Sequence, residues 1–518
     1  MFRSLRHWLD TLRLRRAAYC SRGRAEASRL IVGSTGSGKS EGELVDLARL
    51  AERGDVAVAL LDGHGPLAFR AAGHWLDRGH AARLVYEPLG AIDRVLCWPR
   101  LARSTATHPS ARRIEDAQTR DEVAQSFLAH RNIATLNDRP WTREWLEAAI
   151  DLCLAQPADQ PLPALLDALR TETAGFRRLL RECARPDLAD RFRGLERLRR
   201  RSELQYESVV GGARRLLEPV CTSEVVRLRS RPGPFDWTEA ILNRGLIVFD
   251  GGGIRSTEVK RMLFLLASMQ VIHAVRRHFA CHQRPLPVVL VLEEAGATGL
   301  VTPFVLLALK ELRKAGLAMH LITQSSLDFG DPVAFELLLS STPWQAWYQA
   351  LAPADQEVGA KALANATFDP LAVHFVRRRR AATGTRPVHT AAHGEAYDAH
   401  HRLVRRDHRS GTAHVTAYAQ LAEPAYKSPQ LWEQECRTRL ATLRVGERFV
   451  RDRRGVRHER VRALTELPGF AARTHAGIDC IRQGAIYLPP EEPSPASRQA
   501  EPGAAERLRA RMSDPHQV

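Results

Sequence analysis

The stretch Gly33-Ser34-Thr35-Gly36-Ser37-Gly38-Lys39-Ser40 decides the fold expected for this 518-residue chain. It follows the strand signal Arg29-Leu30-Ile31-Val32 and precedes a helical pattern at 40–53, so it joins a strand to a helix. Its glycines let the backbone curl until successive N–H groups face a phosphate, and the helix start adds the positive end of its dipole. Lys39 supplies a charge to the β- and γ-phosphates, and the Ser40 hydroxyl is a ligand for Mg²⁺. Residues 33–40 therefore predict a phosphate-binding loop, or P-loop, that binds ATP with Mg²⁺.

Strand and helix patterns alternate on either side of an interruption. Apolar runs, which are typical of strands buried on both faces of a parallel sheet, occur at 56–61, 84–86, 246–249, 288–292 and 318–322, the last interrupted by His320. Between residues 110 and 240 the chain is rich in Leu, Ala, Arg and Glu and poor in strand signals. We expect an α/β fold with a mainly parallel central sheet and an inserted all-α subdomain.

The length of the chain predicts more than one structured part. We expect a basic helical segment at 1–28, the first part of the α/β domain at 29–109, the all-α insert at 110–240, the second part at 241–366, a weakly patterned and mobile His/Arg-rich insert at 367–430, a C-terminal helix and β-hairpin completing the α/β domain at 431–487, and a disordered tail at 488–518.

A P-loop needs an acidic partner at the end of a neighbouring apolar strand, and two candidates exist. Asp250 follows one run, and Glu293-Glu294 follow another. The pair is preferred, because Glu293 can hold Mg²⁺ through water while Glu294 acts as the general base for the attacking water. Asp250 is then a strand-end residue that shapes the rim of the sheet. Gln324 ends the next strand, and from its position alone it is a strand-terminal cap.

Four segments together resemble the HerA–FtsK superfamily of DNA-pumping ATPases. They are the P-loop, Glu293-Glu294-Ala295, Leu312-Arg313-Lys314-Ala315-Gly316 and Thr323-Gln324-Ser325. The helical insert is similar to the all-α domain of TraG/TraD-like conjugative coupling proteins and of pilus-assembly ATPases. Asp62-Gly63-His64-Gly65 resembles the Asp-x-x-Gly segment of that branch. The resemblance covers about residues 29–360 and the hairpin near Gly446.

The resemblance implies a RecA-like core, a homo-hexameric ring and ATP-driven movement of nucleic acid through its pore. It also implies that Gln324 senses the γ-phosphate or positions water, and that Arg313 completes the site of a neighbouring subunit. The chain departs from many coupling proteins, which have Asp-Glu at the position of Glu293-Glu294. The Glu-Glu pair of this chain is similar to the HerA branch instead. Coupling proteins also carry N-terminal membrane helices, and no apolar run here approaches the ~18 residues needed. A membrane-anchored secretion or conjugation subunit is the expected anchor for a cytoplasmic protein at the periphery of the inner membrane.

The charge of the chain favours a polyanionic partner. The formal net charge is +17 and the pI is about 10.1, which suit DNA bound without sequence preference, although arginines on solvated faces give the same balance. Arg377 to Arg380, followed by Arg402, Arg405, Arg406 and Arg409, either contact phosphates or form a solvated loop. The eight cysteines include no C-x-x-C pair, and the histidines between 389 and 414 match no standard metal spacing.

These observations predict an ATP-hydrolysing DNA motor in conjugation or mobile-element DNA processing. Two alternatives stay open: a type IV secretion or pilus-assembly ATPase that acts on protein, and a nucleotide-switched scaffold with little turnover. Turnover stimulated by DNA distinguishes the first reading from both others.

Overall fold

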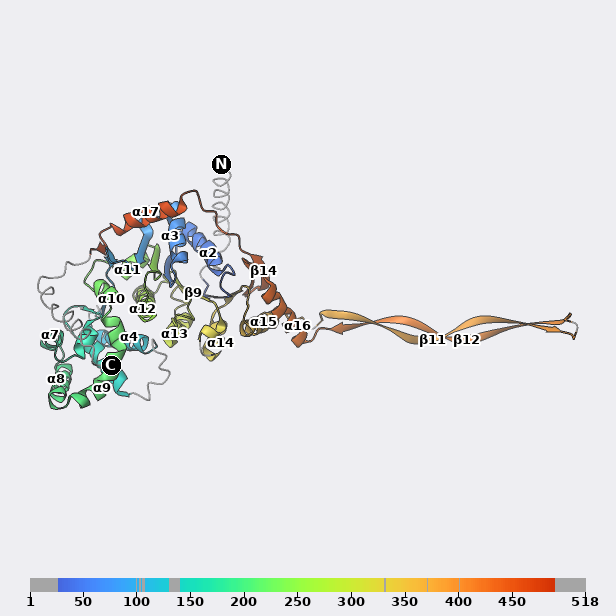
Figure 1. Ribbon diagram of the computed structural model, residues 1–518, viewed down its shortest axis with the longest axis horizontal. Helices are drawn as coiled ribbons and strands as arrows, with labels where there is room; N and C mark the ends of the chain where they lie inside the picture. The colour runs from blue at the N-terminus through green and yellow to red at the C-terminus, as the bar shows by residue number, and fades with distance from the viewer. Residues whose placement is uncertain are drawn as a thin grey trace, which may run out of the picture. The chain divides into compact units, whose positions relative to one another are not determined.

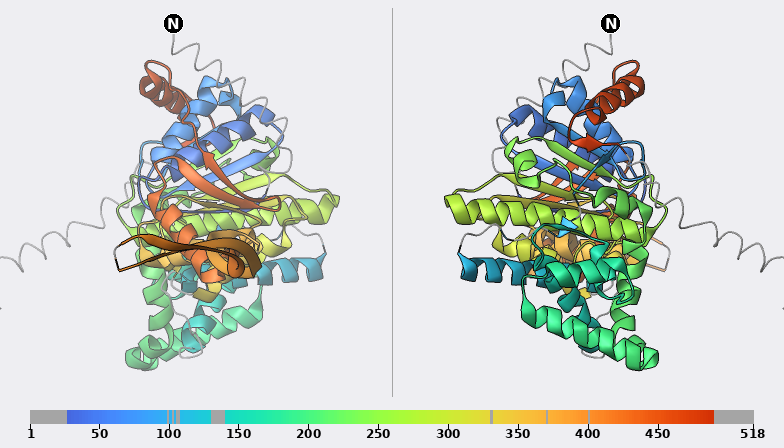
Figure 2. Two further views of the ribbon diagram at one scale, coloured as in Figure 1. Left: turned by 90° about the vertical axis from the view of Figure 1, so that its right-hand side faces the viewer. Right: turned by 90° about the vertical axis from the view of Figure 1, so that its left-hand side faces the viewer.

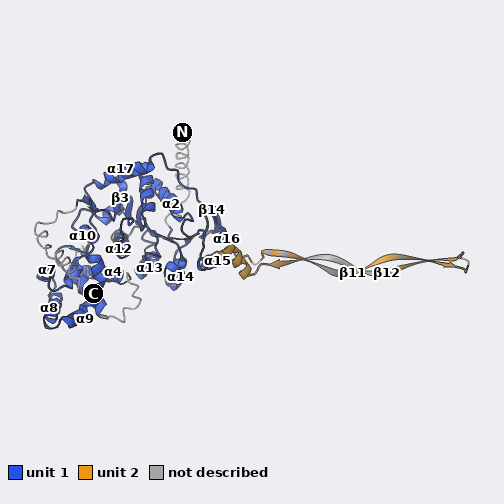
Figure 3. Ribbon diagram, viewed as in Figure 1, with its two compact units in different colours: residues 1–358, 440–518 blue, residues 359–439 orange. Residues whose placement is uncertain are grey.

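The computed structural model describes residues 27–98, 100–101, 104, 108–129, 140–329, 332–369, 371–399 and 401–489. The expected N-terminal helical segment therefore lies outside the described residues except for 27–28, and the expected C-terminal tail except for 488–489. The chain divides into two compact units, residues 1–358 with 440–518 and residues 359–439 (Figure 3).

The first unit is built on a nine-stranded sheet in the order β14-β13-β10-β1-β9-β8-β2-β7-β3 (Figure 1). All pairs from β10 to β3 are parallel, and β13 pairs antiparallel with both β10 and β14. The predicted α/β fold with a mainly parallel sheet is confirmed. The strands are β1 (Arg29–Val32), β2 (Ala57–Asp62), β3 (Leu84–Pro88), β7 (Leu246–Asp250), β8 (Val288–Leu292), β9 (Leu317–Thr323), β10 (Trp344–Trp347), β13 (Glu447–Asp452) and β14 (Gly455–Arg460).

Helices cover both faces of this sheet. Figures 1 and 2 show α2 (Lys39–Arg53), α3 (Pro66–Asp77) and α17 (Phe470–Arg482) on one face, and α12 (Thr257–His282) and α13 (Pro303–Glu311) on the other. Strands β2, β8 and β9 are consequently buried at every residue. This burial explains why their sequences are nearly continuous apolar runs, with His320 inside β9 as an exception, rather than alternating patterns. None of the described helices combines the length and apolarity that crossing a membrane requires.

Helices dominate the chain between β3 and β7. They are α4 (Pro109–Ala129), α5 (Pro140–Leu154), α6 (Ala164–Ala168), α7 (Ala174–Glu182), α8 (Pro186–Arg201), α9 (Glu203–Cys221), α10 (Glu224–Arg229) and α11 (Trp237–Leu242). The short strands β4 (Val95–Leu96), β5 (Arg100–Leu101) and β6 (Gln160–Pro161) accompany them, and β4 pairs with β15 (Tyr487–Leu488). Helices α5 and α9 approach closely at Gly212, where an added Cβ would lie 2.1 Å from the Thr142 hydroxyl oxygen. A glycine inside α9 is therefore required by packing.

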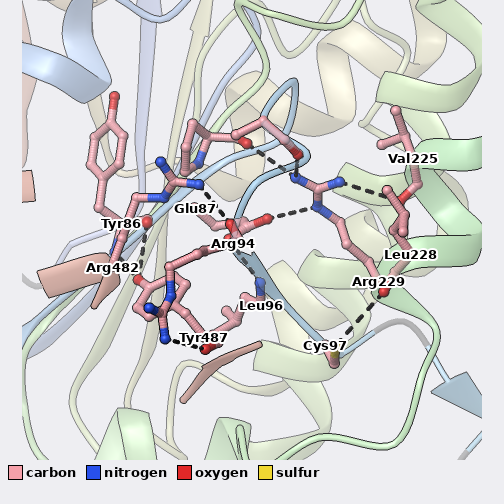
Figure 4. Close-up of polar contacts among 12 residues, drawn as sticks. Tyr86, Glu87, Arg94, Leu96, Cys97, Val225, Leu228, Arg229, Arg482 and Tyr487 are labelled. Carbon is pink, nitrogen blue, oxygen red and sulfur yellow. Dashed lines mark hydrogen bonds and ion pairs between the residues drawn. The ribbon is translucent and has the colours of Figure 1, made fainter. Parts of the chain in front are cut away.

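A buried ion pair joins the end of α10 to the sheet (Figure 4). Arg229 Nε lies 2.6 Å from Glu87 Oε1, and both side chains are fully buried. Arg229 also donates to the carbonyl oxygens of Pro88 and Ala91, and Leu96 N–H donates to the second Glu87 oxygen. Burial raises the pKa of Glu87 to about 7, although Arg229 opposes this shift. Because each polar group is hydrogen-bonded, the pair can persist without water.

The second unit contains a long two-stranded ribbon formed by β11 (Val373–Tyr397) and β12 (Leu403–Tyr426), drawn in Figure 1 as a twisted antiparallel pair. The helices α15 (Pro353–Thr367) and α16 (Pro429–Thr442) precede and follow it in the chain. Sequence reasoning assigned no strand to the insert at 367–430, where the structure has β11 and β12. A strand shows a period of two in its sequence only where one face is buried, and the side chains described along this ribbon are largely exposed on both faces.

Candidate nucleotide site

The P-loop connects β1 to α2 at the carboxyl edge of the parallel strands. Gly36 and Gly38 adopt φ angles of +77° and +97°, which favour glycine. Gly33 is required for a different reason, since a Cβ there would lie 2.6 Å from the Cβ of Tyr348. The loop therefore has the sharp curl that exposes backbone N–H groups.

Lys39 lies across the concave side of this loop. Its ammonium donates hydrogen bonds to the carbonyl oxygens of Gly33 at 2.5 Å and Ser34 at 3.0 Å. Burial lowers the pKa of Lys39, while the nearby carboxylates Glu293 and Glu294 oppose the shift. The ammonium is thus held at the loop, close to both acidic residues that the sequence singled out.

The order of the strands places Glu293 beside Ser40. Strand β8 is separated from β1 only by β9, so its end lies near the loop. The Ser40 hydroxyl donates to Glu293 Oε1 at 2.8 Å. Glu293 is only 6% exposed, and its Oε2 has no hydrogen-bond partner among the described residues. Burial and the charge of Asp62 raise the pKa of Glu293 to about 8, so a cation at this point would stabilise the ionised form. This donor set fits Mg²⁺.

Gln324 links Glu294 to the P-loop. Its amide nitrogen donates to Glu294 Oε1 at 2.6 Å, and its amide oxygen accepts from the Thr35 hydroxyl at 2.6 Å. The partners fix the orientation of the amide, because a carboxylate can only accept. Gln324 follows β9, which lies between β1 and β8, so its amide reaches both the P-loop and Glu294. Its role is therefore more than that of a strand-terminal cap.

Glu294 has an unusual backbone. Its φ angle is +56°, which is uncommon for a residue with a side chain and often marks a functional position. His64, which sequence reasoning did not assign to the site, has its Nε2 3.9 Å from Glu294 Oε1. Its place in the Asp62-Gly63-His64-Gly65 segment was the available signal. Asp62 itself accepts from the backbone N–H groups of His64 and Ala68.

Asp250 lies at the sheet rim away from the loop. Strand β7, which it ends, is separated from β8 by β2. Its carboxylate accepts from the Tyr86 hydroxyl at 2.6 Å and from the Gly252 N–H at 2.8 Å. The structure thus brings Glu293, and not Asp250, to Ser40.

Arg313 is not brought to the loop of its own chain. It is exposed and precedes β9, whereas Gln324 follows that strand. The seven residues of β9 span roughly 20 Å at about 3.3 Å per residue, so Arg313 lies at the opposite edge of the sheet.

The C-terminal hairpin contacts the P-loop, although the two are far apart in the sequence. Gly446 N–H donates to the carbonyl oxygen of Ser37 at 2.9 Å, and a Cβ on Gly38 would lie 2.9 Å from the Gly446 nitrogen. On another side, the N–H of Leu351 donates to the Ser34 hydroxyl at 2.9 Å. Sequence reasoning missed these contacts, which hold the loop in place.

Comparison with known proteins yields matches to solved structures. No family model matches the chain, and no curated protein matches its sequence. The bacterial conjugative coupling protein TrwBdeltaN70, in an unbound form, matches with a TM-score of 0.50 and 15% identity over 87% of this chain and 89% of that chain. The plasmid coupling protein TrwB in complex with ADP and Mg²⁺ matches with a TM-score of 0.51 and 14% identity over the same shares of 87% and 89%.

VirB4 of Thermoanaerobacter pseudethanolicus matches more weakly, with a TM-score of 0.47 and 14% identity over 84% of this chain and 89% of that chain. This score is too low to support an inference about the fold. At such identities the TrwB likeness concerns the fold. It confirms at that level the resemblance to coupling proteins and the RecA-like P-loop core. The chain therefore has the fold of the conjugative coupling protein TrwB.

Proposed function

We propose that this chain is an ATP-hydrolysing motor that moves DNA, in conjugative transfer or in mobile-element DNA processing. The observation that carries the proposal is a set of hydrogen bonds at one edge of the sheet. Ser40 donates to Glu293, and Gln324 bonds to both Glu294 and Thr35. The fold shared with TrwB, a coupling protein described in complex with ADP and Mg²⁺, supports it.

Each residue has a separate part in the proposed reaction. Residues 33–40 hold the phosphates of ATP through backbone N–H groups, and Lys39 contacts the β- and γ-phosphates. Ser40 and Glu293 would hold Mg²⁺, Glu293 through water, and the ion would supply charge neutralisation at the phosphates. Glu294 accepts the proton of the attacking water. Gln324 keeps the Glu294 carboxylate turned toward the loop.

The proposed motor is a homo-hexamer in which Arg313 acts on the site of the next subunit. Its exposure and its distance from the loop of its own chain support a role between subunits. The formal net charge of +17 supports DNA as the sequence-independent substrate. We further propose a cytoplasmic location, with a membrane-anchored secretion or conjugation subunit as a partner at the inner membrane.

Displacement of a third strand from a DNA triplex tests the proposal. A motor that moves along the duplex should release the third strand in the presence of ATP and Mg²⁺, and the Lys39→Ala variant should not. ATP hydrolysis without release, and without any response to DNA, would favour the secretion ATPase that acts on protein. ATP binding without hydrolysis would favour the nucleotide-switched scaffold.

A further inference from the structure

The described side chains of the β11–β12 ribbon are largely exposed and form no hydrophobic core among themselves. Within the described part of the chain its strands pair with each other, from Val373↔Tyr426 to Tyr397↔Leu403, and no other described strand pairs with their outer edges. Isolated two-stranded ribbons are marginally stable in water. A ribbon of this length is therefore expected to gain stability from a partner.

The charge of the ribbon indicates the chemistry of that partner. Residues 373–426 contain nine Arg against four Asp or Glu, a net charge of +5 in 54 residues. The whole chain carries +17 in 518 residues, so the ribbon has almost three times the average density of positive charge. This local excess of positive charge is better explained by binding to a polyanion than by a general role in solubility.

Several guanidinium groups of the ribbon are available for contact. Arg377, Arg378, Arg386 and Arg402 are exposed, and the described residues provide none of these side chains with an ion pair. Arg406, by contrast, lies 2.8 Å from Glu395. Successive side chains of a strand point to opposite faces, so Arg377 and Arg378 place charge on both faces.

The dimensions of the ribbon suit double-stranded DNA. The 25 residues of β11 span about 80 Å at ~3.4 Å per residue, and a duplex of this length carries roughly 45 phosphate charges. Two strands lie about 4.8 Å apart, and the major groove, about 12 Å wide, admits a two-stranded β-ribbon. We propose that the β11–β12 ribbon is a DNA-binding arm whose exposed arginines contact the phosphates of a duplex without reading its sequence.

An anionic membrane surface fits the ribbon less well. Binding in the membrane interface requires an apolar face opposite a charged one. Exposed arginines on both faces of this ribbon oppose such insertion. The DNA assignment rests on the proposed function, because it takes the substrate of the motor as the polyanion, and it adds a binding surface outside the nucleotide site.

Two ribbon variants and one control test the inference in the full chain. The first variant combines Arg377→Gln, Arg378→Gln, Arg386→Gln and Arg402→Gln. The control combines four substitutions at exposed arginines of α7 and α8 that have no ion pair among the described residues, namely Arg177→Gln, Arg181→Gln, Arg197→Gln and Arg201→Gln. Both quadruple variants lower the formal net charge from +17 to +13. Comparing them therefore distinguishes an effect of the ribbon arginines from an effect of total charge.

The second ribbon variant replaces residues 377–423 with an Asn-Gly turn, joining the paired residues Val376 and Pro424. The base of the ribbon stays intact, since Lys427 N–H donates to the Ala372 carbonyl and the Lys427 ammonium lies 2.7 Å from Glu435. The hydrogen bond from Trp432 Nε1 to Thr367 is also retained. Loss of binding in this variant would not depend on misfolding of a substituted strand.

The measurement is the anisotropy of a fluorescent 40-base-pair duplex of arbitrary sequence at several salt concentrations, with ATPase rates measured in parallel. Both ribbon variants should bind at least 10-fold more weakly than wild type at low salt. The slope of log affinity against log salt should become shallower by about 3 to 4 for four lost phosphate contacts. The control should stay within about threefold of wild type.

Duplex affinity unchanged in the ribbon-free variant, or an equal loss in the control, would overturn the inference. Ribbon-dependent binding to phosphatidylserine vesicles without ribbon-dependent DNA binding would overturn it in favour of a membrane surface. If DNA stimulates wild-type ATPase but the ribbon variants bind DNA normally, the inference fails and the proposed motor stands. If the ribbon binds DNA but wild-type ATPase ignores it, the motor fails and the ribbon assignment stands.

Discussion

Replacing Gln324 with alanine tests whether this amide holds the catalytic carboxylate. The substitution removes two short hydrogen bonds, one to Glu294 Oε1 and one from the Thr35 hydroxyl, both 2.6 Å long. It does not touch the hydrogen bonds of Lys39 to the loop or of Ser40 to Glu293. ATP binding should therefore persist, while Glu294 loses the donor that fixes its orientation.

The size of the effect follows from the kind of hydrogen bond. A bond to a charged group contributes about 1.5–3 kcal/mol, and ~1.4 kcal/mol corresponds to a tenfold change in rate. Gln324→Ala should lower kcat about 10- to 100-fold and leave the KM for ATP nearly unchanged. Thr35→Val removes only the neutral bond at the other end of the amide, contributing about 0.5–1.5 kcal/mol, so its kcat should fall less than about 10-fold.

A double-mutant cycle distinguishes a connected chain of bonds from independent effects. Because Thr35 acts on Glu294 through Gln324, Thr35→Val should cost nothing further when Gln324→Ala is already present. Steady-state hydrolysis and fluorescent-nucleotide binding on all four proteins give the cycle. Additive losses, a kcat of Gln324→Ala within twofold of wild type, or a loss confined to ATP binding would refute the reasoning.

Three further predictions concern other residues. Glu294→Gln should lower kcat by roughly 10²- to 10⁴-fold with ATP binding retained, and comparison of hydrolysis with nucleotide binding checks this. Arg229→Met should destabilise the fold by about 3–5 kcal/mol, since it leaves the Glu87 carboxylate buried without its partner. The pKa of Glu87 is about 7 in the folded protein against ~4.3 when unfolded, so the folded state binds the proton more readily. Thermal melting should therefore show that Arg229→Met loses more stability at pH 8, where the Glu87 carboxyl is ionised, than at pH 6. Arg313→Ala should bind ATP but hydrolyse it slowly, and mixing it with Lys39→Ala should give more activity than either alone; activity that never exceeds the two separate proteins would count against an arginine acting between subunits.

The sequence was sufficient to predict the elements that surround the loop. Strands buried on both faces leave nearly continuous apolar runs, so β2, β8 and β9 could be predicted from the sequence. The meeting of Ser40 with Glu293 followed from the motif and from the position of the acid at a strand end.

Other features depend on arrangements that one sequence does not encode locally. The bridge made by Gln324 requires β9 to lie between β1 and β8, and strand order is a property of the whole sheet. The Glu87–Arg229 pair joins residues from distant segments, and each alone resembles an ordinary surface charge. The ribbon at 373–426 was missed because the side chains described along it are largely exposed on both faces, and such strands show no alternation in their sequence.

The rate of ATP hydrolysis with and without duplex DNA, at low and moderate salt, tests the central claim most directly, with Lys39→Ala as the blank. A DNA motor should hydrolyse ATP several-fold faster with DNA, and salt should weaken the stimulation because it competes for the phosphates. The blank should lose both basal and stimulated rates. A Lys39-dependent rate that is the same with and without DNA would contradict the account.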